Sequence, residues 1–385
     1  MIAYTEGGIV NKADPPSSVK VSVIIPVYQE SDMLESLLKS LLLDPYRSKE
    51  IFVIIDKPTE RSLNLAERMD DRVQFILNGH RVGKVHALNE AANRTTGEIL
   101  LFLDSDIKLV KKDPKFLETI VNEMGDFDLL DIKKKVIRTT FTTRIVHYDY
   151  LCSNIAIWLF SKFLGKSLGF NGAAFAIKQQ TFKRLGGFYR AVADDMDIGT
   201  RSYLNNCSFK YTENVEIATK APSEWKEWYK QRKRWGLGTA LWIRDYYKDL
   251  LKTMVNSPKF ILPAIFLICP SLILLIINLL LPDILSYQFL MVLMLLAATQ
   301  IGILLPPMLF AFVGITFVKN IVATVISFGA LTTIYYLFAR KFRYKFHPFE
   351  FFCYYFIFSP LFLFIVAINL LKVCMHSSVE IDWKY

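Results

Sequence analysis

Two acidic residues that could hold a divalent cation follow a short apolar stretch at residues 99–103. This stretch has the length and flanking residues of a buried parallel strand, and Asp104 and Asp106 come directly after it. Ligands bind at the carboxyl ends of strands in an open α/β sheet, and residues two apart on an extended backbone point the same way. Carboxylate oxygens suit Mg²⁺ or Mn²⁺ that also keeps water and substrate phosphates as ligands. An acidic turn explains the spacing equally well when it is taken alone.

The elements that must position this pair alternate between strand and helix patterns. Strands are predicted at residues 19–27, 51–55 and 73–77, ahead of the strand at 99–103, with helical segments between them. Strands that alternate with helices at this spacing imply right-handed βαβ units. The predicted fold class is therefore α/β with a mostly parallel sheet.

Polar residues at the ends of the earlier strands would lie on the same edge of the sheet as Asp104. A nucleotide on this edge would find acceptors for its base, and a lysine at a helix N-terminus could face its phosphates. Each of these residues is ordinary in a loop, but together they predict a nucleotide-binding cleft. The residues are Tyr28, Glu30, Asp56 and Lys84, and Pro26, which closes the first strand, is counted with the same site.

Two segments further along the chain add candidates for sugar chemistry. Asp194 and Asp195 could simply cap a helix that begins near Asp197. Gln231, Arg234 and Trp235 would share one helix face, because they lie at positions i, i+3 and i+4. An amide, a guanidinium and an indole there suit a diphosphate and a stacked sugar ring. The alternative is an aromatic, basic helix lying on lipid headgroups through Trp225, Trp228 and Trp242.

These motifs, in this order, resemble those of the family 2 inverting glycosyltransferases. The segments are Val-Ser-Val-Ile-Ile-Pro-Val-Tyr-Gln-Glu (21–30), Arg-Val-Gly-Lys-Val-His-Ala-Leu-Asn (81–89) and Phe-Leu-Asp-Ser-Asp (102–106). The resemblance covers roughly residues 19–242 and implies the A-type, nucleotide-sugar-binding fold. It implies that Asp56 contacts the nucleobase, that Lys84 lies near the diphosphate, and that Asp104 and Asp106 form the D-x-D motif. Lys57-Pro58-Thr59 departs from the acidic or small residues usual after Asp56.

The later motifs carry the resemblance to the acceptor side. Ala193-Asp194-Asp195 looks like the family's T-E-D motif, which implies that Asp195 is the catalytic base. The Q-x-x-R-W sequence of residues 231–235 resembles the processive branch, which comprises the cellulose, chitin and hyaluronan synthases. Asp56, Asp104, Asp106 and Asp195 are accordingly expected to converge on one metal and sugar-nucleotide pocket.

The last part of the chain has the composition of membrane-spanning helices. The 385 residues are 52% apolar and include 30 Phe and 18 Tyr, and most of the apolar excess lies after residue 258. Four spans are predicted, with residues 308–318 as a short interfacial helix, at 260–281, 287–305, 321–338 and 349–371. Four crossings, with Trp383 in a cytoplasmic tail, would leave the basic residues 340–345 outside, against the positive-inside rule. Five crossings would remove that conflict.

The predicted organisation is a leader (1–18), a catalytic domain (19–242), an amphipathic interfacial linker (243–258), about four transmembrane helices (259–371) and a tail (372–385). The first twenty residues lack a signal-peptide pattern, so the catalytic domain should be cytoplasmic. An apolar stripe over residues 144–164 fits either core packing or a helix on the membrane surface.

Charge distribution and cysteine spacing argue against a nucleic-acid-binding protein, a disulfide-rich protein and a zinc protein. The net charge is +10, but nine basic against four acidic residues lie between Glu224 and Lys259, just ahead of the first predicted span. That placement fits the positive-inside rule better than nucleic-acid binding. The five scattered cysteines imply neither a disulfide framework nor a zinc site.

The sequence therefore predicts a membrane-bound, metal-dependent, inverting hexosyltransferase. Its partners would be a nucleoside diphosphate sugar, a glycan or lipid-linked acceptor, and the lipid bilayer. Polysaccharide synthesis is the first expectation, and transfer of a single sugar to a polyprenyl phosphate or other lipid is the second. A membrane-anchored sugar-nucleotide sensor without activity is the third.

Overall fold

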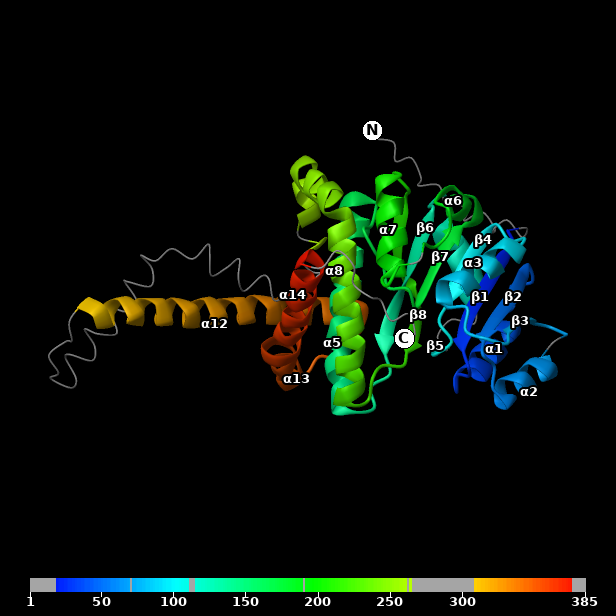
Figure 1. The fold of residues 1–385 in the computed structure, drawn as a ribbon, viewed down its shortest axis with the longest axis horizontal. Helices are drawn as coiled ribbons and strands as arrows, with labels where there is room; N and C mark the ends of the chain where they lie inside the picture. Colours follow the sequence, from blue (N-terminus) through cyan, green and yellow to red (C-terminus); the bar gives the residue numbers. More distant parts are fainter. Residues whose placement is uncertain are drawn as a thin grey trace, which may run out of the picture. The chain divides into compact units, whose positions relative to one another are not determined.

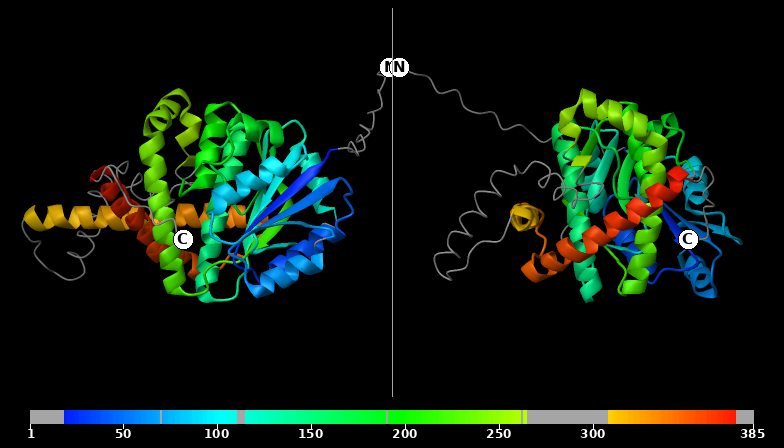
Figure 2. Two further views of the ribbon diagram at one scale, coloured as in Figure 1. Left: turned by 45° about the vertical axis from the view of Figure 1, so that its right-hand side comes forward. Right: turned by 60° about the vertical axis from the view of Figure 1, so that its left-hand side comes forward.

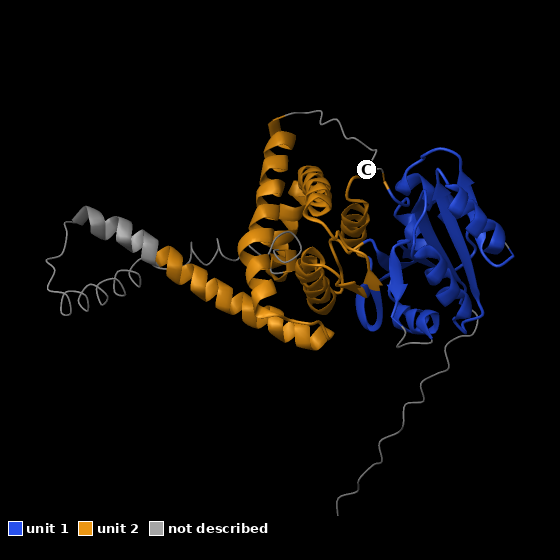
Figure 3. Cartoon of the chain, turned by 90° about the horizontal axis from the view of Figure 1, so that it is seen from below, with its two compact units in different colours: residues 1–132, 172–188, 207–217 blue, residues 133–171, 189–206, 218–385 orange. Residues whose placement is uncertain are grey.

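The computed structural model describes residues 19–69, 71–110, 115–189, 191–261, 263–264 and 308–375, with the side chains of 308–318 left out. The elements are shown in chain order in Figure 1. The chain divides into two compact units (Figure 3). Unit 1 comprises residues 1–132, 172–188 and 207–217, and unit 2 comprises residues 133–171, 189–206 and 218–385.

A mixed sheet forms the centre of unit 1. Its first four strands pair in parallel. Three of them, β1, β2 and β4, are largely buried, as expected for strands covered on both faces, whereas β3 is mostly exposed or half-buried. They are β1 (Val21–Tyr28), β2 (Lys49–Asp56), β3 (Gln74–Asn78) and β4 (Ile99–Leu103). Strands β1 and β2 lie side by side in both views of Figure 2, in dark blue.

The remaining strands correct the expectation of a mostly parallel sheet. β7 (Ala174–Lys178) runs antiparallel to β4 on one side and to β6 (Leu129–Val136) on the other. The full strand order is β3-β2-β1-β4-β7-β6-β8-β5, where β5 is Ile107–Leu109 and β8 is Phe209–Thr219. A short buried strand has the same apolar pattern whether it pairs in parallel or antiparallel. The pattern of β7 therefore does not predict its direction.

Helices with one apolar face pack on this sheet. In α1 (Leu34–Leu43) the buried residues are Leu34, Leu37, Leu38 and Leu41, a spacing that puts them on one face of the helix. They join the side chains of β1, β2 and β4 in one core cluster. The other helices of unit 1 are α2 (Glu60–Met69), α3 (Lys84–Arg94), α4 (Phe116–Met124) and α6 (Gln179–Arg184).

Unit 2 is mainly helical. Its helices are α5 (Phe141–Leu164), α7 (Asp194–Leu204), α8 (Trp225–Asn256), α12 (Met308–Phe342), α13 (Pro348–Cys353) and α14 (Ser359–Met375), with short turns η1 (Pro258–Phe260) and η2 (Tyr354–Phe358). A capping box of Thr140 and Thr143 begins α5, and Gly165 ends it in the left-handed conformation. Most side chains of α5 are buried, so its apolar stripe is core packing.

Two long helices differ from the segments expected there. α8 continues without a break to Asn256, so residues 243–256 extend the helix that carries Gln231 and Trp235. α12 is likewise one helix from Met308 to Phe342, so the expectation of a separate short helix over residues 308–318 is wrong. The sequence has two prolines, Pro306 and Pro307, directly before α12. The 35 residues of α12 contain no proline that would break the helix.

Two helices in the described part of the chain are long and apolar enough to cross a membrane. They are Lys319–Phe342 and Pro348–Met375, and they match the third and fourth predicted spans. The second predicted span, nearly all of the first, and Trp383 lie outside the described residues.

Candidate active site

Asp104 and Asp106 follow β4 as expected, and Asp104 forms an ion pair with Lys84. All five residues of β4 are buried, and Asp104 follows at its carboxyl end. Lys84, the first residue of α3, places its Nζ atom 2.8 Å from Asp104 Oδ1. Lys84 follows Gly83, whose φ of +93° suits glycine. A lysine and an aspartate predicted to act on one diphosphate are thus in direct contact.

Asp104 and Asp106 offer only hard oxygen ligands. This donor set fits Mg²⁺ or Mn²⁺, which accept carboxylates and keep positions for water and phosphate oxygens. In the described part of the chain, no group of three or more His, Cys, Asp or Glu side chains assembles a cation site. A cation held here would therefore draw its other ligands from solvent and substrate.

Asp56 builds the loop that leads into α3. Its side chain is buried, and Oδ2 accepts hydrogen bonds from the N–H groups of Val82 (3.2 Å) and Gly83 (2.8 Å). Oδ1 accepts a third bond, of 2.9 Å, from the Asn78 side-chain amide. These contacts fix the backbone immediately before Lys84. Direct contact between Asp56 and a nucleobase stays a prediction.

The ends of three strands are level, as the cleft prediction requires. In the parallel ladders Tyr28 is the partner of Asp56, and Asp56 is the partner of Asn78. The chain turns sharply after the first two strands, where Gln29 and Lys57 have φ values of +61° and +53°. Left-handed backbone at non-glycine residues is uncommon and clusters at functional sites.

The exposed side chains along this edge combine an aromatic ring with charges. The Tyr28 ring is 48% exposed and lies 4.6 Å from the guanidinium carbon of Arg81. Glu30 Oε2 accepts a 2.6 Å hydrogen bond from the Thr59 hydroxyl. Pro26 is half-buried within β1. Unit 1 therefore brings Tyr28, Asp56, Lys84 and Asp104 to the carboxyl ends of its parallel strands.

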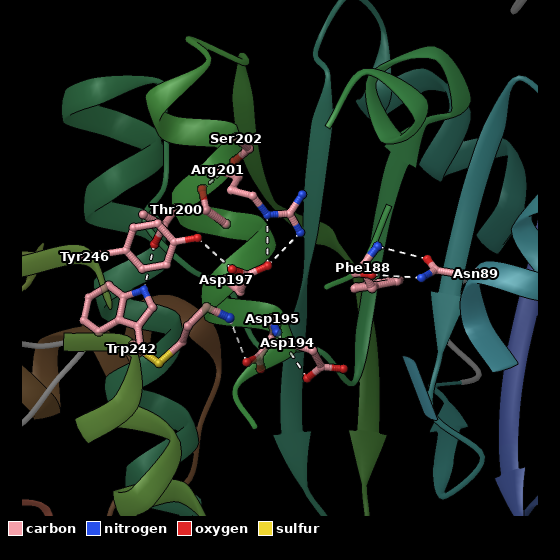
Figure 4. Close-up of polar contacts among 12 residues, drawn as sticks. Asn89, Phe188, Asp194, Asp195, Asp197, Thr200, Arg201, Ser202, Trp242 and Tyr246 are labelled. Carbon is pink, nitrogen blue, oxygen red and sulfur yellow. Dashed lines mark hydrogen bonds and ion pairs between the residues drawn. The ribbon is translucent and has the colours of Figure 1, made fainter. Parts of the chain in front are cut away.

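In unit 2, the acidic motif forms the first turn of α7 (Figure 4). The Asp195 N–H donates to Asp194 Oδ1 at 3.2 Å, and the Met196 N–H donates to Asp195 Oδ1 at 2.9 Å. The N-cap position itself is Ala193, which has no side chain to cap the helix. The helix thus begins at Asp194 rather than near Asp197, and neither aspartate is its N-cap; each carboxylate accepts from the N–H of the next residue instead. The role of Asp195 as catalytic base stays a prediction.

A buried cluster on α7 was missed by the sequence reasoning. Asp197 Oδ2 accepts bonds of 2.9 and 2.7 Å from Arg201 Nε and Nη2, and Oδ1 accepts a 2.7 Å bond from the Tyr246 hydroxyl of α8 (Figure 4). Burial raises the pKa of Tyr246, and its bond to Asp197 raises that pKa further. The i, i+4 spacing of Asp197 and Arg201 was a visible signal, but the distant tyrosine was not.

On α8 the Q-x-x-R-W residues surround a buried arginine that is not part of the motif. Arg232 is 1% exposed, and its Nη2 donates to Asp149 Oδ2 of α5 at 2.7 Å. Its guanidinium carbon lies 4.1 Å from the centre of the Trp235 ring. Burial raises the pKa of Asp149, and Arg232 opposes that shift. Arg234, by contrast, is exposed.

The tryptophans near this motif are mostly enclosed by protein. Trp228 and Trp242 are 0% and 3% exposed, so they do not lie on lipid headgroups. Trp228 stacks on Trp225 and meets Phe358 edge-on at 5.1 Å. Gln231 is half-buried, and its Oε1 has no hydrogen-bond partner among the described residues.

Helix α14 packs along the same helix. A Cβ atom on Gly236 would lie 2.8 Å from Ile365 Cγ2, so glycine permits this close approach. Further along, Ala240, Leu241 and Val373 share an apolar cluster. The helix that carries Trp235 is therefore held by α5 on one side, through Asp149, and also by α14.

Comparison with known proteins shows what the first part of the chain is similar to. Residues 22–179 match the family model described as Glycosyl transferase family 2. Over 224 residues the chain is 24% identical to a probable glucomannan 4-beta-mannosyltransferase of Arabidopsis thaliana, covering 56% of this chain and 39% of that protein. Over 248 residues it is 23% identical to a poly-beta-1,6-N-acetyl-D-glucosamine synthase of Staphylococcus aureus, covering 60% and 57%. The chain thus spans 39% and 57% of the lengths of these relatives.

A solved structure shares the fold over nearly the whole chain. It is a mannosyltransferase of Pyrobaculum calidifontis in complex with GDP-Man and Mn²⁺. The match has a TM-score of 0.54 at 18% sequence identity and covers 93% of this chain and 88% of the other. Residues 22–179 are therefore similar to glycosyltransferase family 2 domains, and the chain shares an α/β fold with the mannosyltransferase structure.

Proposed function

We propose that this protein is a membrane-bound, inverting glycosyltransferase that moves a hexose from a nucleoside diphosphate sugar to a hydroxyl of a glycan acceptor, in polysaccharide synthesis. The observation that carries the proposal is the contact between Lys84 and Asp104 within a family 2 domain. The ammonium group of Lys84 and the carboxylate of Asp104, a type of group that binds metals, meet at the carboxyl ends of the parallel strands. Ligands usually bind at this edge of an α/β sheet. The two polysaccharide-forming relatives support the choice of a glycan acceptor.

The donor side would use residues of unit 1. Lys84 and the N-terminus of α3 would bind the diphosphate, and the exposed Tyr28 ring would offer a surface for the base. Asp104 and Asp106 would hold Mg²⁺ or Mn²⁺, and the presence of Mn²⁺ and GDP-Man in the structural neighbour supports both partners. When bound, the cation would neutralise charge on the leaving diphosphate.

The acceptor side would use residues of unit 2. The acceptor oxygen forms a bond to the anomeric carbon while the bond from that carbon to the diphosphate breaks, and the diphosphate leaves with the electron pair. Asp195 would take the proton from the attacking hydroxyl. Trp235 would stack on the acceptor sugar, and Arg234 would add positive charge for the leaving group. Asp194 and Gln231 would contact the acceptor or the diphosphate.

We also infer a membrane location with the catalytic domain in the cytoplasm. The two candidate spanning helices support this inference. The purified full-length protein, given radiolabelled GDP and UDP sugars with Mn²⁺, should consume one of them and build a ladder of products. A single labelled glycolipid would favour transfer to a lipid acceptor, and neither transfer nor donor hydrolysis with any sugar nucleotide would overturn the proposal.

The base assignment has its own test. Asp195→Asn should lower the transfer rate about 10²–10⁴-fold, the usual range for a general base. Binding of the sugar nucleotide should stay within twofold of the wild-type value. Asp249→Asn, an exposed position on α8, is the matched control. Full transfer activity in the Asp195→Asn protein would remove Asp195 from the mechanism.

A further inference from the structure

Two buried residues and one half-buried tyrosine join α7 to α8 within unit 2, and we call them the α7 clamp: Asp197, Arg201 and Tyr246. The Asp197 and Arg201 side chains are only 11% and 10% exposed, and the carboxylate accepts all three hydrogen bonds described above. Arg201 also lies over the ring of Tyr189, with 3.8 Å between its guanidinium carbon and the ring centre.

A second set of hydrogen bonds also links α7 to α8. The Trp242 Nε1–H donates to Thr200 Oγ1 at 2.8 Å, and the Thr200 hydroxyl donates to the carbonyl of Leu168 at 2.9 Å. Trp242 and Tyr246 are four residues apart on α8, and Asp197 and Thr200 are three apart on α7. Each pair therefore shares one helix face, and the two faces meet.

Glycine lets the backbones approach closely on the same faces. A Cβ atom on Gly238, one turn before Trp242, would lie 3.2 Å from Ala193 Cβ and 3.3 Å from Val192 Cγ1. A Cβ atom on Gly199 would lie 2.5 Å from Gly169 Cα. Gly238, Trp242 and Tyr246 thus form one stripe of α8 that contacts α7 and the residues just before it.

The first turn of α7 nevertheless has space beside it. A cavity of about 130 Å³ is lined by Ala193, Asp197, Trp242, Tyr246 and neighbouring residues. Close packing normally prevents such a turn from shifting, and here part of that packing is missing. The hydrogen bonds of the clamp therefore add to the apolar contacts of Val192 and Met196 in holding the turn in place.

Stability alone does not account for a buried ion pair at this position. Desolvation of two charges offsets much of their attraction, and well-packed apolar residues of similar size often stabilise as well or better. What the pair adds is a defined geometry, because the carboxylate must face Arg201 and Tyr246 at once. The residues whose geometry it fixes are Asp194 and Asp195, which share the first turn of α7 with Asp197.

We propose that the α7 clamp is a positioning device for the catalytic base: it fixes the first turn of α7, with Asp195, on the helix that carries Trp235. This inference rests on the proposed function, in which Asp195 takes the acceptor proton. Asp197, Arg201 and Tyr246 would act through Asp195 and would not contact the reacting atoms themselves.

Tyr246→Phe tests the clamp, because it removes one hydrogen bond and keeps the ring. We expect kcat to fall at least 10-fold while KM for the sugar nucleotide stays within twofold. Tyr247→Phe, at the neighbouring exposed position, should behave as wild type. In the Asp195→Asn background, Tyr246→Phe should cause no further loss of the residual rate, because residues that act as a unit are non-additive.

Two results would overturn the clamp while leaving the proposed function intact: wild-type kcat in Tyr246→Phe, or an equal loss of rate with and without Asp195. The second result would make the clamp merely structural. If Tyr246→Phe does not fold, Arg201→Lys gives the same test, since it keeps the charge but loses the two-point contact with Asp197. Absence of sugar transfer by the wild-type protein would instead remove the proposed function, and the clamp with it.

Discussion

The side-chain amide of Asn89 pairs with the backbone of Phe188, 99 residues further along the chain (Figure 4). Nδ2 donates to the Phe188 carbonyl at 2.8 Å, and the Phe188 N–H donates to Oδ1 at 2.9 Å. Gly187 has a φ of +72°, and a Cβ atom there would lie 2.8 Å from Asn89 Oδ1. Asn89 belongs to α3, so this pairing ties the turn at Gly187 to the helix that begins with Lys84.

Asn89→Ala should therefore lower the free energy of unfolding by about 1–3 kcal/mol, because it leaves two partly buried backbone groups without partners. Asn89→Asp should not restore stability, since an ionised carboxylate cannot donate to the Phe188 carbonyl. Thermal unfolding of the full-length protein in detergent measures both effects. Asn93→Ala, at an exposed position of the same helix, is the control and should change little. Equal unfolding temperatures for Asn89→Ala and Asn93→Ala would contradict the prediction.

Local sequence patterns made the parallel strands of unit 1 predictable. The apolar runs of β1, β2 and β4 are short and bounded by polar residues, so both the strands and the residues at their ends could be found from the sequence. The contact between Lys84 and Asp104 follows once the strands are parallel, because their carboxyl ends then meet at one edge.

Contacts between distant segments could not be predicted in the same way. Arg232 looks like any other residue of a basic helix, and its partner Asp149 lies 83 residues earlier. Tyr246 is 49 residues from Asp197. Such pairs depend on how helices pack, which one sequence does not specify. The motif drew attention to Arg234, which is exposed, rather than to the buried arginine two residues before it.

Replacement of Arg232 should leave the carboxylate of Asp149 without its ion-pair partner. Arg232→Met should reduce the free energy of unfolding by about 3 kcal/mol, because Asp149 then lacks its charged partner and is left with the Tyr354 hydroxyl. Adding Asp149→Leu should recover most of that loss, since an apolar pair of similar size is often as stable. The double variant should still show a raised KM for the acceptor, because the guanidinium no longer supports Trp235.

Lys233→Met, at the exposed neighbouring position, is the control for both measurements. An unchanged unfolding temperature in Arg232→Met would mean that the ion pair contributes nothing to stability. A wild-type acceptor KM in the double variant would show that Trp235 keeps its position without Arg232.

His147 should make the protein sensitive to acid. Burial lowers the pKa of His147 to about 3, nearby Arg138 acts in the same direction, and a 3.0 Å hydrogen bond to the Lys345 carbonyl opposes them. An unfolded histidine titrates near pH 6.5. Between these values the unfolded chain takes up a proton that the folded protein does not, so the free energy of unfolding falls as the pH drops from about 6.5 towards 3.

The loss due to His147 could reach about 5 kcal/mol at the acid end of this range, at 1.36 kcal/mol per pKa unit. His147→Gln keeps a donor for Lys345 without titrating near neutral pH, so it should show a weaker loss of stability between pH 6.5 and 5. Unfolding measured at several pH values gives the difference between the two proteins. Parallel pH curves for wild type and variant would exclude His147 as the source.

The loop between the two candidate spans lies against the glycosyltransferase domain. His147 contacts the Lys345 carbonyl, and the Tyr148 hydroxyl bonds to both the N–H and the carbonyl of His347, at 2.9 and 3.0 Å. Glu350, at the start of α13, pairs with Arg138. Helix α5, which carries His147 and Tyr148, is within the family 2 match. We therefore predict that the loop and helix α5 lie on the same side of the membrane.

This contact would put the basic residues 340–345 on the cytoplasmic side, in accord with the positive-inside rule. In a cysteine-free background, Lys345→Cys should resist a membrane-impermeant maleimide in intact cells and react after permeabilisation. Leu43→Cys, an 83% exposed position in α1, reports the side of the catalytic domain and should give the same pattern. Labelling of Lys345→Cys in intact cells, with Leu43→Cys protected, would place loop and domain on opposite sides and refute the shared topology.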